Sequence, residues 1–503
     1  MFSWLENLLS KVKKLNSVVN QYKEDTVIQS LPSFAHVNKA KKLIEKNDLK
    51  EAKKVLIKAL EFPNKDALVY KYLGIIYDKE KKFDKAVAAY QISADWNPHD
   101  KNIWQKLGFA LIQINKYEEA VKSFDNANRI SANNTDTFTG WGMALMKQQK
   151  YDEAREKFSK ASALNRYNFS AIFLNAVMDI KLKEYSKAEM KLTFLANVCP
   201  NETNTYEFAH LKFLKGEYES AKHYAIKSLD YNPNMLPSYL LIAKVYALSF
   251  DEDNALSYFQ MAENRELIAA SLYHEWGLVL EKFERYEEAK LKFLKAFEMD
   301  NEKIETIAHL GLCNVALKNF DEAEPILQKV LESEPENKIV KQALGIVSYE
   351  NKNFEQAVKC FKESFDEDED DSISFYYLAK CYEAMNNDSK VKDSYETAIL
   401  KNPKYISAYV DYAKYLITCD NYAEAQRKLR KALKIEPENI EILNLLFFTS
   451  YMLVKENVCE YNIKETVAIA QKIEGINPDL FEYPDKKNEL SEILKEKSER
   501  EQN

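Results

Sequence analysis

Apolar and small side chains recur along the chain with the spacing of one helix face, in two successive stripes. In the segment from Lys101, the first stripe follows the i, i+3, i+4, i+7 pattern at four positions: Trp104, Leu107, Gly108 and Leu111. After polar residues around Asn115, a second stripe keeps helical spacing at three positions: Ala120, Phe124 and Ala127. The pattern predicts two amphipathic helices joined by a short turn, with small residues where the two backbones approach each other.

This pair of stripes repeats along most of the chain. Its alanine returns mostly at intervals of 34 residues: Ala52, Ala86, Ala120, Ala154, Ala188, Ala221, Ala255, Ala289, Ala323, Ala357 and Ala425. Two irregularities leave the frame intact, because the step from Ala188 to Ala221 is 33 residues and Val391 replaces one alanine. Units start near Ser33, Ala67, Lys101, Thr135, Phe169, Glu202, Leu236, Ala270, Ile304, Lys338, Ser372, Ile406 and Ile440. Such a period is typical of a solenoid in which each unit packs on its neighbours.

The recurring residues resemble the signature of the tetratricopeptide repeat. The resemblance is clearest in two units, which carry Trp104, Leu107, Gly108, Leu111, Ala120 and Phe124, and Trp276, Gly277, Leu280, Tyr286, Ala289 and Phe293. It covers about residues 33–478. The resemblance implies an all-α fold, a right-handed superhelical α-solenoid of about 13 tandem helix-turn-helix repeats. The last unit lacks the alanine, as expected of a terminal capping repeat.

Four segments are expected along the chain. Residues 1–32 form an N-terminal amphipathic helix and linker, and residues 479–503 form a charged C-terminal helix or tail. Between them, repeats 1–5 occupy residues 33–201 and repeats 6–13 occupy residues 202–478. The division after residue 201 rests on the shortened step and on weak signatures, among them Asn175 where a large apolar residue is expected.

The sequence favours a protein without enzymatic activity. The flanks of 32 and 25 residues are too short to bury a catalytic core, which needs roughly 100 residues. The chain has 9 glycines and no glycine-rich phosphate-binding motif. We therefore predict no catalytic residues, no cofactor and no small-molecule substrate.

Charge and cysteine usage exclude further classes of ligand. The net charge is -8, from 71 basic and 79 acidic residues, which disfavours nucleic acid as a ligand. The 6 cysteines form no CxxC pair, so no metal site is expected. Cys313 and Cys381 fall at the same place in their units and are predicted to be small buried side chains. Free cysteines suit a reducing compartment, and we expect a cytoplasmic location.

Function is expected on the concave surface, which the resemblance assigns to the second, fifth, sixth and ninth positions of the first helix of each unit. These positions do not reproduce the carboxylate clamp of family members that bind chaperone tails. Apolar and aromatic residues predict instead a groove for a peptide or amphipathic helix of a partner protein. The candidate partner-binding residues are Tyr72, Ile75, Phe109, Met143, Phe173 and Val177. The alternative is that these side chains only pack between neighbouring helices.

The N-terminal segment carries an apolar face with lysines beyond it. The face consists of Phe2, Trp4, Leu5, Leu8, Leu9 and Val12. It can dock on the first repeat and cover its open apolar end, or lie on a membrane surface. Docking is the favoured interpretation. A separate acidic block at residues 366–371 is interpreted as a solvated loop.

Two functional classes follow from these observations. The first is a scaffold or adaptor that binds peptide or helical segments of partner proteins in the groove. The second is a regulatory or targeting subunit of a multiprotein enzyme complex, for which the N-terminal helix offers a means of membrane association. The sequence alone does not separate the two.

Overall fold

The computed structural model describes residues 32–61, 66–365, 371–456 and 460–502. In these ranges all regular secondary structure is α-helical apart from one short 3-10 helix, which confirms the all-α prediction. The helices are α2 (Pro32–Glu45), α3 (Leu49–Ala59), α4 (Ala67–Lys79), α5 (Phe83–Trp96), α6 (Lys101–Gln113), α7 (Tyr117–Ile130), α8 (Thr135–Lys147), α9 (Tyr151–Leu164), α10 (Phe169–Lys181), α11 (Tyr185–Val198), α12 (Glu202–Leu214), α13 (Tyr218–Tyr231), α14 (Leu236–Leu248), α15 (Glu252–Asn264), α16 (Ala270–Lys282), α17 (Tyr286–Met299), α18 (Ile304–Ala316), α19 (Phe320–Ser333), α20 (Lys338–Glu350), α21 (Phe354–Lys362), α22 (Ser372–Ala384), α23 (Asp388–Lys401), α24 (Ile406–Thr418), α25 (Tyr422–Ile435), α26 (Ile440–Glu456), α27 (Glu460–Ile476), η1 (Pro478–Leu480) and α28 (Pro484–Gln502).

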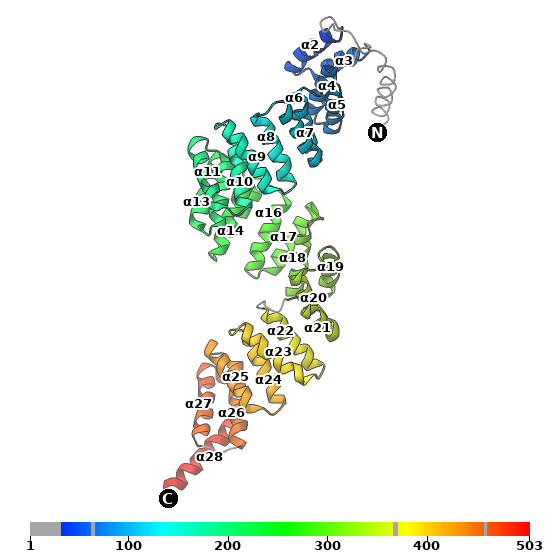
Figure 1. The fold of residues 1–503 in the computed structure, drawn as a ribbon. Helices are drawn as coiled ribbons and strands as arrows, with labels where there is room; N and C mark the ends of the chain where they lie inside the picture. Colours follow the sequence, from blue (N-terminus) through cyan, green and yellow to red (C-terminus); the bar gives the residue numbers. More distant parts are fainter. Residues whose placement is uncertain (1–31, 62–65, 366–370, 457–459, 503) are drawn as a thin grey trace. The chain divides into compact units, whose positions relative to one another are not determined.

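Within each unit consecutive helices form pairs, from α2 and α3 to α12 and α13 in the first unit and from α16 and α17 to α26 and α27 in the second (Figure 1). We call the two members of a pair helix A and helix B of the repeat, and α14 and α15 take these two positions of the repeat frame in the sequence. From the second pair onward, helix A begins at the residue where the sequence predicts a unit to begin. The tandem helix pairs of a tetratricopeptide-like solenoid are therefore confirmed. The segment predicted as a charged C-terminal helix contains α28.

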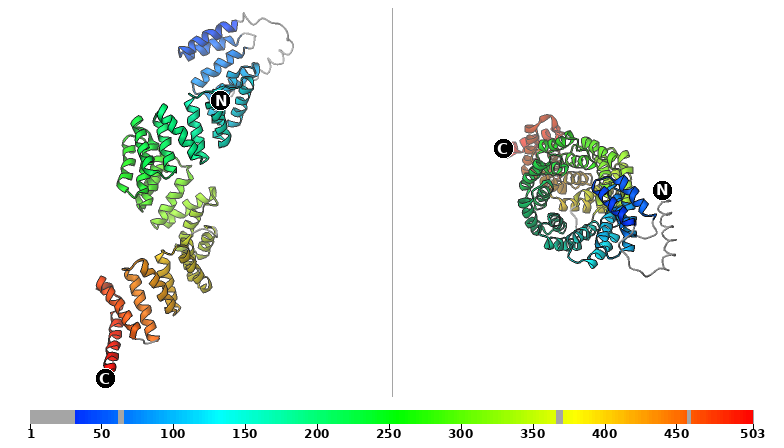
Figure 2. Two further views of the ribbon diagram at one scale, coloured as in Figure 1. Left: turned by 60° about the vertical axis from the view of Figure 1, so that its left-hand side comes forward. Right: turned by 90° about the horizontal axis from the view of Figure 1, so that it is seen from above.

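The chain divides into two compact units, Met1–Val245 and Tyr246–Asn503. The first contains α2 to α13 and most of α14, and the second contains α15 to α28. Figure 2 shows the antiparallel helix pairs of each unit from two further directions. The boundary predicted after residue 201 is a different division of the chain and stays a prediction.

Small residues allow helices A and B of one repeat to approach closely. A Cβ atom built on Gly108 in α6 would lie 2.7 Å from the ring of Phe124 in α7. Ala120, Phe124 and Ala127 on α7 are all buried. The same arrangement pairs Gly277 with the ring of Phe293 in the second unit. Close packing therefore explains why the predicted small positions recur with the repeat.

Most turns between helix A and helix B contain a residue in the left-handed backbone region. This residue recurs with the repeat at Asn47, Lys81, Asn115, Gln149, Lys183, Gly216, Phe250, Glu284, Lys318, Lys352, Asn386 and Asp420. At the end of α4, the Lys82 amide donates to the Tyr77 carbonyl at 2.8 Å, and this hydrogen bond, which spans the left-handed residue Lys81, caps the C-terminus of the helix. Only Gly216 is a glycine, so packing of the helices holds the other turns in a conformation that side chains disfavour.

Asn314 on α18 is a polar side chain enclosed in the core of the second unit. It is fully buried, and neither its Oδ1 nor its Nδ2 has a hydrogen-bond partner among the described residues. It is the eleventh residue of its unit, where other repeats place Leu111 and Leu145. An unsatisfied buried amide costs roughly 1 to 3 kcal/mol.

Substitution Asn314→Leu is therefore expected to raise the free energy of unfolding of the second unit by about 1 to 2 kcal/mol. Urea denaturation measures this change. The matched control is Asn444→Leu, because Asn444 donates to the Leu480 carbonyl at 2.9 Å and accepts from the Glu482 amide at 3.3 Å. That variant should lose stability. Equal effects of the two substitutions would contradict the explanation.

Candidate partner-binding groove

The A helices line the inner side of each unit. Successive A helices contact one another, as α2 contacts α4, α6 contacts α8 and α18 contacts α20. Contacts between successive B helices are fewer. The closer spacing on one side makes the A side the concave side of the local stack. The groove predicted from the resemblance therefore lies on this side.

A hollow of about 570 Å³ opens on the A side of the first unit. Its walls come from α4, α6, α8 and the start of α10, and its lining residues are Lys71, Asn102, Gln105, Lys106, Phe109, Asp136, Thr139, Asn168 and Ser170. Except for Asn168, all of these residues occupy the second, fifth, sixth or ninth positions of their units. All of the lining residues except Phe109 have polar side chains, and Phe109 is the one aromatic ring.

Fifth-position side chains in this hollow bind the residue that caps the next A helix. Lys71 Nζ lies 2.7 Å from Asp100 Oδ2, and Gln105 Nε2 donates to Asn134 Oδ1 at 2.8 Å. The cap residue Asn168 donates to Thr139 Oγ1 at 3.1 Å. These cap side chains also accept hydrogen bonds from the first turn of their own helices.

The same contact recurs in the second unit, where Gln342 Nε2 donates to the cap residue Asp371 at 2.8 Å. Fifth-position side chains therefore join consecutive repeats to each other. A ligand that uses these side chains would have to break hydrogen bonds of the solenoid.

Other side chains of the lining remain available to a ligand in the hollow. Within the described part of the chain, no hydrogen bond or ion pair engages the side chains of Asn102, Lys106 and Asp136. Phe109 adds a half-buried ring. An amide, a cation, a carboxylate and a ring together can contact the main chain and mixed side chains of a polypeptide.

The six predicted partner-binding residues are all half-buried on A helices of the first unit. Phe109 is the one that lines the hollow, and its ring packs edge-on against Phe124 at 5.1 Å between centroids. Tyr72, Ile75, Met143, Phe173 and Val177 pack against the core clusters of their repeats. These residues thus contribute to packing, and their role in binding stays a prediction.

The sequence interpretation passed over the polar lining of the hollow. Asn102, Lys106 and Asp136 occupy positions that the resemblance assigns to the concave face, so the signal was present in the repeat frame. The predicted partner-binding residues were mostly apolar side chains at the ninth positions, such as Ile75, Phe109 and Met143. Reading the second and sixth positions of consecutive units together would have found these side chains.

Burial shifts the pKa values of two thiols and one imidazole in the second unit. Cys313 and Cys381 are fully buried, which confirms their predicted position, and burial raises the pKa of each thiol to about 12. Burial, with a smaller effect from Lys303, lowers the pKa of His274 to about 4. His274 Nδ1 lies 3.0 Å from Thr306 Oγ1. These groups therefore stay uncharged near pH 7.

The described residues offer neither a cluster of metal-ligating side chains nor a membrane-spanning helix. In that part of the chain, no three His, Cys, Asp or Glu side chains group as a metal site. None of its helices combines the length and apolar content needed to cross a bilayer. The proposed capping or membrane face, Phe2, Trp4, Leu5, Leu8, Leu9 and Val12, lies outside the described residues. So do residues 366–370 of the acidic block, while its last residue, Asp371, caps α22.

Comparison with known protein families agrees with the repeat pattern. A family model of the N-terminal tetratricopeptide-repeat region of Psidin matches residues 41–201, and a tetratricopeptide-repeat model matches residues 304–337. No curated protein matches the sequence.

Several solved structures align with the chain at low identity. The APC/C hetero-tetramer Cut9–Hcn1 aligns over 82% of this chain and 95% of that chain, with 13% identity and a TM-score of 0.44. Yeast Tom70 aligns over 88% of this chain and 99% of its own, with 18% identity and a TM-score of 0.35. A tetratricopeptide repeat protein from Parabacteroides merdae aligns over 48% and 98%, with 18% identity and a TM-score of 0.44.

Proposed function

This chain is a tetratricopeptide repeat protein, and from that premise we propose that it is a non-enzymatic scaffold or adaptor that binds segments of partner proteins along its A helices. The observation that carries the proposal is the hollow between α4 and α10, where Asn102, Lys106, Asp136 and Phe109 face a common space. The mixed chemistry of this lining suits an extended peptide or one face of a helix. We place the protein in the cytoplasm, because the five described cysteines are free thiols.

The double substitution Asn102→Ala and Lys106→Glu tests the proposal. It removes an amide and reverses a charge in the hollow, and neither substituted side chain is buried. We expect recovery of specific partner proteins with the purified full-length chain to fall roughly tenfold, because central polar contacts of an interface commonly contribute 1 to 2 kcal/mol. Quantitative mass spectrometry of proteins copurified from the native cell measures the loss.

The matched control is Lys122→Glu on the exposed side of α7, which makes the same change of charge away from the hollow. The Lys122→Glu variant should recover the same partner proteins, in the same amounts, as the unaltered chain. Equal losses for both variants, or no loss for either, would contradict binding in the hollow. Turnover of a small molecule by the purified chain would contradict the non-enzymatic proposal.

A further inference from the structure

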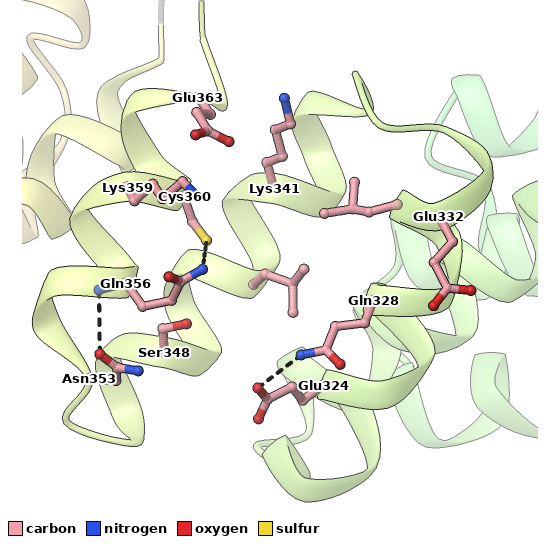
Figure 3. Close-up of a pocket in the computed structure, with 12 residues that line it drawn as sticks. Glu324, Gln328, Glu332, Lys341, Ser348, Asn353, Gln356, Lys359, Cys360 and Glu363 are labelled. Carbon is pink, nitrogen blue, oxygen red and sulfur yellow. Dashed lines mark hydrogen bonds between the residues drawn. The ribbon is translucent and has the colours of Figure 1, made fainter.

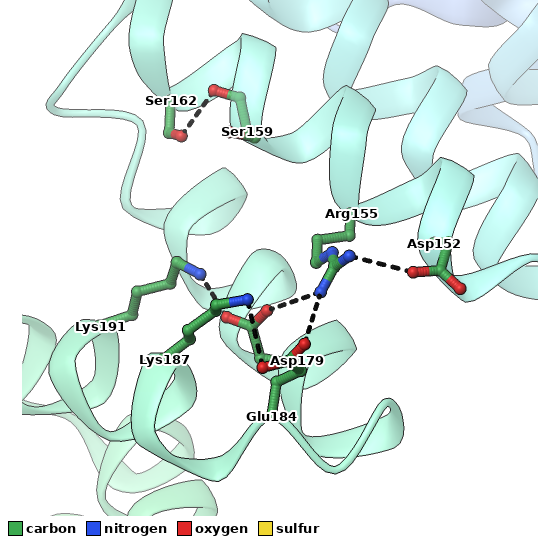
Figure 4. Close-up of polar contacts among 8 residues, drawn as sticks. All are labelled: Asp152, Arg155, Ser159, Ser162, Asp179, Glu184, Lys187 and Lys191. Atoms are coloured by element: carbon green, nitrogen blue, oxygen red, sulfur yellow. Dashed lines mark hydrogen bonds and ion pairs between the residues drawn. The ribbon is translucent and has the colours of Figure 1, made fainter.

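A second hollow of the first unit lies on the opposite side, between the B helices α9 and α11. Its volume is about 370 Å³, and it is lined by Ser159, Ser162, Ala163, Arg166, Ile172, Asn175, Lys191 and Phe194. Figure 4 shows Ser159 and Ser162 on α9 and Lys191 on α11. The hollow is near the lower end of the range for ligand pockets, roughly 300 to 1,000 Å³, which suits a single large side chain.

Exposed apolar side chains surround this hollow. Phe194 is 43% exposed, and its ring centroid lies 6.4 Å from that of Phe169, which in turn lies 6.4 Å from that of Tyr167. Met190 and Val198 lie one turn to either side of Phe194 on α11 and are 69% and 51% exposed. A contiguous apolar surface of this kind on a soluble domain commonly marks a protein contact.

Asn175 is an unpartnered amide in the wall of this hollow. The residue is 3% exposed, and its Oδ1 has no hydrogen-bond partner among the described residues. It is the seventh residue of its unit, where other repeats place Leu73, Leu107, Leu310 and Leu344. A half-turn of the amide exchanges its oxygen and its NH₂ group, so it can accept or donate a hydrogen bond.

The charged lining of this hollow is cationic. Lys191 forms an ion pair with the buried Asp179, which neutralises the charge of the lysine. The Arg166 guanidinium donates to Tyr167 Oη at 2.8 Å and has no carboxylate partner among the described residues. No acidic side chain lines the hollow. Arg166 therefore complements a carboxylate brought by a ligand.

The equivalent hollow of the second unit lacks these features. It lies between α19 and α21, has a volume of about 520 Å³, and carries the acidic residues Glu324, Glu332 and Glu363 (Figure 3). In the repeat frame, Leu344 takes the place of Asn175, and Glu363 takes the place of Phe194. The equivalent hollow of the second unit therefore lacks the buried amide and the exposed ring, and its lining places the cations Lys341 and Lys359 together with three carboxylates.

We propose that the hollow between α9 and α11 is a second protein-binding site, which accepts a tryptophan side chain from an acidic segment of a partner protein. The indole ring packs against Phe194 and Ile172, and its N–H group pairs with the Asn175 amide. A neighbouring carboxylate of the same segment pairs with Arg166. Tryptophan fits this lining because it combines a large apolar body with a single hydrogen-bond donor. This site is independent of the groove on the A side.

Indole-3-acetate is a suitable probe, because it carries the indole ring, the N–H donor and a carboxylate in one small molecule. Titration of the full-length chain, followed by ligand-observed NMR, should show binding with a Kd of about 1 mM. Two altered probes test the two polar contacts. 1-Methylindole-3-acetate lacks the donor, and tryptamine replaces the carboxylate by an ammonium group. Each should bind roughly fivefold more weakly or not at all.

Variants of the chain locate the probe. Asn175→Leu restores the residue type that other repeats use, so this variant should fold and gain stability while its affinity for indole-3-acetate falls roughly fivefold. Phe194→Ala should weaken binding to a similar degree. Asn314→Leu makes the same substitution in the second unit and should leave affinity unchanged.

The combination Asn102→Ala and Lys106→Glu in the groove on the A side should also leave affinity for the probe unchanged, which separates this test from that of the proposed function. Equal binding of tryptamine and indole-3-acetate would overturn the proposal. So would unaltered affinity in the Asn175→Leu variant. A gain in stability of this variant without a loss of binding would assign Asn175 to core packing alone.

Discussion

Substitution Lys191→Met is expected to lower the free energy of unfolding of the first unit by about 3 to 5 kcal/mol, because it leaves a buried carboxylate without its main partner. That carboxylate belongs to Asp179, whose side chain is fully buried on α10. Lys191 on α11 forms an ion pair with one of its oxygens, and Arg155 Nη1 on α9 lies 3.8 Å from the other (Figure 4). Denaturation of the full-length chain, followed by tryptophan fluorescence, measures the change. Trp96, Trp104 and Trp141 report on the first unit.

The double variant Asp179→Leu and Lys191→Met is the control for this explanation. Leucine occupies the same eleventh position in two other repeats, at Leu111 and Leu145. Replacement of a buried ion pair by apolar side chains of similar volume is commonly close to neutral. The double variant should therefore recover most of the stability that Lys191→Met loses. A single variant within about 0.5 kcal/mol of the unaltered chain would show that Arg155 alone can neutralise Asp179.

The repeat frame and the helix pairs could be predicted from the sequence because both follow from short-range packing. The spacing of Leu107, Gly108 and Leu111 defines one helix face, and a Cβ on Gly108 would meet the Phe124 ring at 2.7 Å. Each repeat satisfies these constraints within 34 residues, so the sequence of a single unit is sufficient to predict its helix pair. The start of each A helix from α4 onward was therefore predicted at the correct residue.

The binding surfaces could be predicted only in part, because they depend on contacts between repeats. The hydrogen bond from Gln105 to Asn134 joins residues 29 positions apart. Because its side chain makes this bond within the fold, Gln105 is not available to a ligand. The sequence marked Asn175 as a departure from the repeat pattern. It did not indicate that Phe194 and Arg166 line the same hollow, because these residues come from different helices.

Substitution Phe124→Ala is expected to destabilise the first unit by about 3 to 5 kcal/mol, since it removes a fully buried ring that fills the space between two repeats. Cβ atoms built on Gly108 and Gly140 would both lie within 2.7 Å of the Phe124 ring, so this ring occupies the room that two glycines on successive A helices leave open. The Phe109 ring, which lines the groove, packs in a T-shaped arrangement with the Phe124 ring at 5.1 Å between centroids. Loss of Phe124 should therefore also disturb the hollow on the A side.

The control is Phe34→Ala on α2, a substitution of the same type at a side chain that is 56% exposed, which should change stability by less than about 0.5 kcal/mol. Comparable effects of the two substitutions would mean that the size of the ring, and not its enclosure between repeats, determines the loss of stability.

A further variant, Phe124→Leu, separates the explanation by ring size from the explanation by enclosure. In Phe124→Leu, partial filling of the cavity should limit the loss to less than half of that in Phe124→Ala, because the fifth repeat pairs Ala176 with Leu192 at the equivalent positions and both are fully buried.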